Sequence, residues 1–157
     1  MSAMMHYLTV QDVLWVNLTV TKRVNHFNEA RLEEATFYQC AYGDSTGLVP
    51  QAGRFMSGFL RMHPIASGNE ATAFVSGIAF LRMNGKNIKL SDSDAAQWLA
   101  EISAKRKTGR ESIEAIVEDF DAGHEPDLRA IVGGVLADFP QTIEHLVSEA
   151  DSQSVGA

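Results

Sequence analysis

Apolar residues recur at intervals of three and four positions along most of this chain, and no segment sustains the two-residue alternation of a half-buried strand. This periodicity predicts an all-α protein. Two of the predicted helices start at Thr9 and at Ser91. The other six cover residues 28–43, 50–63, 69–84, 111–121, 127–138 and 141–150. We expect the small, polar tail 151–157 to be frayed.

The predicted helix 69–84 is apolar on almost every side, whereas the other predicted helices carry one apolar stripe. A helix without a polar face needs cover all round, so it belongs at the centre of a helical bundle. Two of the other helices have clear N-terminal signals, a capping box of Thr9 with Asp12 and a capping side chain at Asn28. Gly43 can adopt the left-handed conformation that closes a helix.

The composition is that of an ordinary globular protein, with 157 residues, 45% of them hydrophobic and 21% charged. A chain of this length can form one domain without a disulfide or a metal. Cys40 is the single cysteine, which fits a reducing compartment. No uncharged run exceeds 11 residues, and no Lys or Arg precedes Lys22. We therefore expect no membrane span and no signal peptide, and a cytoplasmic protein.

Charge divides the chain into two parts. Residues 1–109 hold 11 Lys and Arg against 9 Asp and Glu, while residues 110–157 hold 2 against 11, so their net charges are +2 and -9 and sum to -7. We expect a helical core over 1–109 and an acidic helical extension over 110–157 packed on the same domain. The extension either faces solvent or docks on a basic surface. The net negative charge argues against nucleic acid as a partner.

Several short patterns lack the context that their chemistry needs. Residues 43–47 match a nucleophile elbow, but a predicted helix precedes them where a strand is required. Residues 119–124 start like a calcium loop but lack its turn glycine. The histidines show no metal-ligand spacing with each other or with Cys40; they are His6, His26, His63, His124 and His145. We therefore assign no metal ligands.

The segment 63–73, His-Pro-Ile-Ala-Ser-Gly-Asn-Glu-Ala-Thr-Ala, places a histidine at the end of one helix and a glycine at the start of the apolar helix. A helix N-terminus offers unpaired amides and a partial positive charge to an anion, and Gly68 would let a phosphate come close to the backbone. His63 would lie beside that phosphate. The alternative is that Pro64 and Gly68 only shape a turn between helices and that Asn69 is a cap.

At these residues the chain resembles the Fic/Doc family, in particular its death-on-curing (Doc) branch, whose motif reads His-Pro-Phe-x-Asp-Gly-Asn-Lys-Arg-Thr-Ala. The chain shares six residues of that motif: His63, Pro64, Gly68, Asn69, Thr72 and Ala73. The likeness covers roughly residues 7–102 and is most specific over 63–85, and 110–157 lies outside it. It implies a Fic/Doc-like helical bundle around a central apolar helix, with extra C-terminal helices.

The resemblance also implies an activity, the transfer of phosphate or AMP from a nucleotide to a protein hydroxyl, with ATP or another nucleotide and Mg²⁺ as the cofactors. His63 would be the catalytic general base. The nucleotide phosphates would be held by Ser67, Gly68, Asn69 and Thr72. A loop that docks the target protein would consist of Gly43, Asp44, Ser45, Thr46 and Gly47.

Three departures from the motif bear on that activity. Ser67 replaces the acidic residue that binds magnesium, and Glu70 and Ala71 replace the two cations that neutralise phosphate. Phosphoryl transfer depends on positioning and charge stabilisation. We therefore expect a degenerate Fic/Doc-family protein, weak or inactive in transfer, that acts through protein binding in the manner of a toxin–antitoxin system.

Two other readings stay open. One is an active phosphoryl- or nucleotidyltransferase that uses His63 with a different metal arrangement. In the other, the acidic segment 110–157 fills the cleft as an antitoxin segment would. The partners expected are a target protein or an antitoxin-like protein, with a homo-oligomer as a further possibility, and neither nucleic acid nor a membrane.

Overall fold

The computed structural model describes residues 4–155, and within them the chain is mostly helical, with eight helices and two short strands. The elements, in chain order, are α1 (Val10–Thr21), α2 (Glu29–Phe37), α3 (Leu48–Met62), α4 (Asn69–Met83), β1 (Lys86–Ile88), α5 (Asp92–Ser103), α6 (Gly109–Glu114), β2 (Val117–Asp119), α7 (Leu128–Asp138) and α8 (Pro140–Val155). The predicted helical fold class is confirmed at this level.

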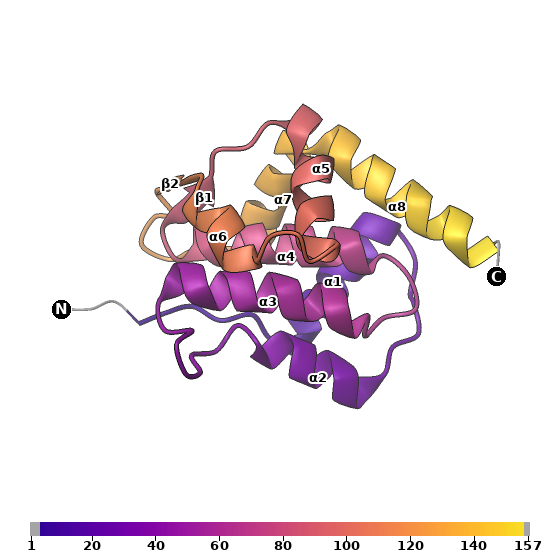
Figure 1. Ribbon diagram of the computed structural model, residues 1–157, viewed down its shortest axis with the longest axis horizontal. Coiled ribbons are helices and arrows are strands. Elements are labelled where there is room, and N and C mark those ends of the chain that lie inside the picture. Colours follow the sequence, from indigo (N-terminus) through magenta and orange to yellow (C-terminus); the bar gives the residue numbers. More distant parts are fainter. Residues whose placement is uncertain (1–3, 156–157) are drawn as a thin grey trace.

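Helix α4 is the centre of the bundle, as its all-apolar sequence predicts. Every residue from Ala71 to Met83 is buried, and α1, α3, α7 and α8 all pack against the helix. Figure 1 shows α4 behind α3, with α1 beyond it and α7 and α8 above. The Fic/Doc-like arrangement of this bundle stays a prediction.

The N-terminal capping signals of the first two helices are confirmed. Thr9 and Asp12 form the expected capping box, with Asp12 N donating to Thr9 Oγ1 at 3.0 Å. The Asn28 side chain accepts from Arg31 N at 3.0 Å. These bonds satisfy amides that have no partner inside the helix.

The predicted end of the second helix at Gly43 is wrong, because α2 stops at Phe37. The side chain of Gln39, which is buried, donates to Leu8 O at 2.6 Å and accepts from Leu8 N at 2.7 Å. These long-range bonds hold the chain after α2 against the N-terminal segment. Gly43 does have a positive φ of 56°, but it lies in a turn between Tyr42 and Ser45, which exchange two backbone hydrogen bonds.

The predicted helix 111–121 is also wrong in its second half. Helix α6 ends at Glu114, and β2 pairs antiparallel with β1, with Ile88 opposite Val117. Each strand has 3 residues, too few for a two-residue alternation to be visible in the sequence. At the other end of the chain, α8 runs to Val155, beyond the predicted end at 150, and residues 156 and 157 lie outside the described part.

The C-terminal helices cover three different helices of the first 109 residues. Helix α6 packs on α3, α7 on α4 and α8 mainly on α5 (Figure 1). They add fully or nearly fully buried apolar side chains to the core: Ile113, Val132, Val135, Phe139 and Leu146. The buried Arg82 of α4 also pairs with Asp138 of α7 at 2.8 Å. Within the described residues, no helix is long and apolar enough to cross a membrane.

Helices α3 and α6 touch backbone to backbone at Gly53 and Gly109, which gives a first prediction. A Cβ at Gly53 would lie 2.4 Å from Arg110 N, so Gly53→Ala forces the two helices apart. We expect it to lower the free energy of unfolding by about 3 kcal/mol, measured by urea denaturation. Gly133→Ala is the control. Gly133 lies in α7 with open space around it, so Ala should raise stability by about 1 kcal/mol. Equal effects of the two variants would contradict the close contact.

Asp92 ties the start of α8 to α5 and gives a pH prediction. Burial alone would raise the pKa of its carboxyl, but hydrogen bonds from the Thr142 hydroxyl and from the amides of Thr142 and Gln141 outweigh burial and lower the pKa. The ionised form therefore stabilises the fold above the unfolded pKa of about 3.9, and this stability is lost as the pH falls through the lower folded pKa.

Asp92→Asn should therefore reduce stability at neutral pH, and the deficit relative to wild type should shrink in acid, as measured by thermal unfolding across pH. Asp94→Asn is the matched control, since it removes a charge from the same first turn and leaves the Asp92 bonds in place. A deficit that stays constant from neutral pH to acid would contradict the role of the carboxylate.

Candidate functional site

His63 ends α3 and begins the turn into α4. It has a left-handed backbone with φ of 45°, and its amide closes the helix on Phe59 O at 3.2 Å. The side chain is half-exposed, and Nε2 lies 3.8 Å from Glu70 Oε1. That distance is too long for a hydrogen bond, so the two groups attract each other only when the imidazole is protonated. The structure thus brings together the predicted base and an acidic side chain.

The turn 64–68 is held in place by the segment before α2. Asn28 N donates to Pro64 O at 2.9 Å, and Ala66 N donates to His26 O at 2.8 Å. Between them, Phe27 and Ile65 form an isolated β-bridge. The backbone of the turn is therefore fixed against the segment 26–28.

The side chain of Asn69 forms hydrogen bonds to this same turn. Its Oδ1 accepts from Ile65 N at 3.1 Å and its Nδ2 donates to Ile65 O at 2.6 Å. Only 4% of the residue is exposed. Both polar atoms of Asn69 already have partners, as expected of a residue that shapes a turn.

Asn17 of α1, which sequence reasoning missed, binds two of the predicted phosphate positions. Its Nδ2 donates to Ser67 O at 2.9 Å and to Thr72 Oγ1 at 3.0 Å, and its Oδ1 accepts from Asn25 Nδ2 at 2.9 Å. Asn17 is buried. A buried amide must be hydrogen-bonded, which makes this network a fixed part of the fold. The available signal was an Asn on the core-facing side of α1, between Val13 and Val20.

Arg23 places a cation where the family motif has a magnesium ligand. Its Nη2 donates to Ser67 Oγ at 3.1 Å. This contact was also missed, because Arg23 follows the end of α1 and is 44 positions away from Ser67 in sequence. With this donor as its partner, the Ser67 hydroxyl is a poor ligand for a divalent cation.

The packing of α1 requires a glycine at position 68. Its φ is 78°, and a Cβ there would lie 2.4 Å from Thr21 Cγ2 and 3.1 Å from Asn17 Nδ2. The side of Gly68 where a Cβ would lie is therefore covered by α1. If the glycine served only to admit a phosphate, that side would be open. The amides of the first turn of α4 have no side-chain cap.

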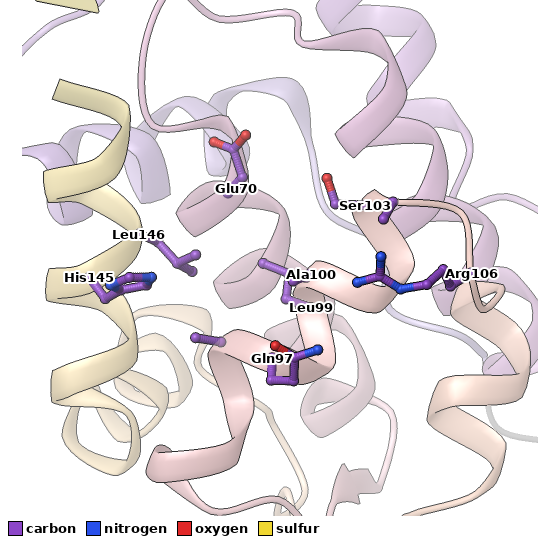
Figure 2. A pocket seen from close by; sticks show the side chains of 10 residues that line it. Glu70, Gln97, Leu99, Ala100, Ser103, Arg106, His145 and Leu146 are labelled. Atoms are coloured by element: carbon purple, nitrogen blue, oxygen red, sulfur yellow. The ribbon is translucent and has the colours of Figure 1, made fainter. Parts of the chain in front are cut away.

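The two remaining motif positions, Glu70 and Ala71, differ in burial. Ala71 is fully buried, so the core leaves no room for the second cation of the motif. Glu70 faces outwards into a groove of about 510 Å³ between α4, α5 and α8. Figure 2 shows Glu70 at one end of this groove, Arg106 at the other and His145 on the α8 side.

The loop proposed to dock a target lies far from His63. Gly43, Asp44, Ser45, Thr46 and Gly47 come just before α3, whereas His63 follows its last residue. A helix of 15 residues is about 22 Å long. The loop is folded on itself, with Thr46 Oγ1 donating to Gly43 O at 3.2 Å. The structure does not bring it to the histidine.

Among residues 4–148, whose side chains are described, no three His, Cys, Asp or Glu side chains come close enough together to hold a metal ion.

Comparison with protein-family models, with curated proteins and with solved structures gives no match to the chain. The resemblance to Fic/Doc proteins stays a prediction.

The contact between α1 and Gly68 can be measured by substitution. Gly68→Ala adds a left-handed alanine and a clash with Thr21, whereas Gly123→Ala, at φ of 77° with nothing within 4 Å, adds the backbone strain alone. We expect a loss in the free energy of unfolding of about 1 kcal/mol for Gly123→Ala and of about 3 kcal/mol for Gly68→Ala. Adding Thr21→Ser, which removes Cγ2 and keeps the hydroxyl, should recover part of the second loss. Equal losses at the two glycines, with no rescue, would show that α1 does not cover Gly68.

Proposed function

We propose that this chain is a Fic/Doc-like protein that is inactive in the transfer of phosphate or AMP from a nucleotide and acts by binding a protein partner. The observation that supports this most directly is the use of the phosphate-binding positions. Ser67 and Thr72 bond to Asn17, Asn69 bonds to Ile65, and Gly68 packs against α1. Each of these positions has a structural role, so only the uncapped backbone amides of the first turn of α4 are left for a nucleotide, without the side chains that would hold its phosphates.

The magnesium ion that the family uses does not fit the residues present. A divalent cation needs oxygen ligands, carboxylates above all. At the corresponding position the chain has the Ser67 hydroxyl, which accepts a hydrogen bond from the Arg23 guanidinium. We therefore derive no step through a metal.

Charge near the N-terminus of α4 also opposes a triphosphate. Glu70 lies in the first turn of α4, and its carboxylate is 3.8 Å from His63 Nε2. At position 71 the buried methyl group cannot be replaced by a cation without disrupting the core. His63 could still accept a proton, but the phosphate groups of a nucleotide would meet a negative charge beside it.

The C-terminal extension supports the same view. It supplies Ile113, Val132 and Phe139 to the core, so the acidic segment is part of the folded domain. A detachable segment that masks an active cleft would contribute less to that core. We expect deletion after Gly109 to unfold the chain instead of releasing an activity.

The test is a transfer assay with ATP labelled on the α- or the γ-phosphate, in the presence and absence of Mg²⁺, against a cell lysate and against the chain itself. We expect no labelled protein above the level given by His63→Ala. An active Fic/Doc protein run in parallel shows that the assay works. Label transfer that requires Mg²⁺ and disappears in His63→Ala would overturn the proposal and favour the active transferase.

A further inference from the structure

A basic groove lies on the face of α3 that is turned toward the link between α5 and α6. Its volume is about 330 Å³, and its walls carry three cations, Arg61, Lys105 and Lys107. Among the described residues that line it there is no carboxylate. In a chain of net charge -7, three cations around one groove are a local exception to the overall charge.

The backbone around these cations is well fixed. Lys105 has a φ of 62°, and its amide bonds to Ile102 O at 3.0 Å. Lys107 N bonds to Glu101 O at 3.2 Å. Arg61 lies over the Tyr38 ring with Cζ 5.4 Å from its centroid, and its Nη2 donates to the Tyr38 hydroxyl at 3.0 Å. A ligand would therefore meet cations whose attachment points are already in place.

The acidic side chains nearby are already engaged. Glu101 pairs with Arg106 at 2.9 Å and also accepts from Gln97. Glu111 accepts from the Thr108 amide in a capping box. In the described part of the chain, no ion pair joins a carboxylate to any of the three groove cations. Lys107 does act on Glu101 at longer range, helping to lower the pKa of that carboxyl after the hydrogen bond from Arg106, so the charge available to a ligand is mainly that of Arg61 and Lys105.

The groove is also apolar at its base, where Leu60 and Ile102 are exposed by 5% and 4%. From Arg61 the surface continues along α3 through Tyr38 to Arg54, whose Cζ lies 4.8 Å from the ring centroids of both Tyr38 and Tyr42. Tyr and Arg are enriched at protein interfaces and at their energetic centres. The surface is thus longer than a small anion requires.

We infer that this groove binds an acidic segment of a partner protein, with an apolar side chain of that segment on Leu60 and Ile102. The inference rests on the proposed function, which it deepens by naming the partner's chemistry. Glu33 and Glu34 on α2 border the surface near Arg54, so the acidic residues of the partner belong at the Arg61 and Lys105 end.

The experiment measures fluorescence polarisation of a labelled peptide of repeated Asp-Glu-Leu on the full chain, with a Lys-Arg-Leu peptide and inorganic tripolyphosphate as comparison ligands. Lys105→Glu is paired with Lys22→Glu. Both lysines are exposed, have φ near 60° and follow a helix, and both substitutions change the net charge equally, but Lys22 does not line the groove. Thermal melts check that both variants fold, and Lys107→Glu is the second groove variant.

We expect the acidic peptide alone to bind, and Lys105→Glu and Lys107→Glu to weaken it by about tenfold while Lys22→Glu changes it by less than about twofold. Binding should also weaken as the Debye length falls from about 30 Å to about 8 Å between 0.01 and 0.15 M salt. Equal losses in the groove and control variants would overturn the inference. So would binding of tripolyphosphate but not of peptide, or self-association of the chain that the groove variants abolish. None of these readouts involves ATP. If the transfer assay shows no labelled protein and the acidic peptide does not bind, this inference alone is refuted, and the proposed lack of transfer activity stands.

Discussion

The amide of Asn17 is the interaction on which the candidate site depends. It joins α1 to the turn before α4 through Ser67 O and to the first turn of α4 through Thr72 Oγ1. Removing one partner of a buried hydrogen bond leaves the other unsatisfied, which costs about 1–3 kcal/mol. This arrangement keeps α1 against Gly68, where only a glycine fits. Three of the four residues that would cradle a phosphate, Ser67, Gly68 and Thr72, are thus used to join two helices.

The central helix could be predicted because its sequence has one strong property. Helix α4 is apolar all round, and a helix of that kind has to be buried. The capping residues Thr9 and Asn28 could be predicted equally well, since the side chain of each accepts from the amide three positions further along the chain. The ends of α2 and α6 could not be predicted, because Gln39 and Val117 take partners 31 and 29 positions away.

The candidate site shows the same division between local and distant information. His63 was expected at the end of a helix next to the motif turn, and it lies there. The residues that decide what the turn can bind come from α1 and the segment after it, Asn17, Thr21 and Arg23, which are distant in sequence. The separation of loop 43–47 from His63 follows from the length of α3 between them.

The central claim is that the N-terminus of α4 does not receive nucleotide phosphates. Titration of the ¹⁵N-labelled protein with Mg-ATP, followed at the amide signals of residues 68–72, measures this directly. The account predicts no saturable shift at these amides up to about 1 mM nucleotide, which corresponds to a binding free energy weaker than about -4 kcal/mol. Saturable shifts centred on Gly68 and Asn69 would contradict it.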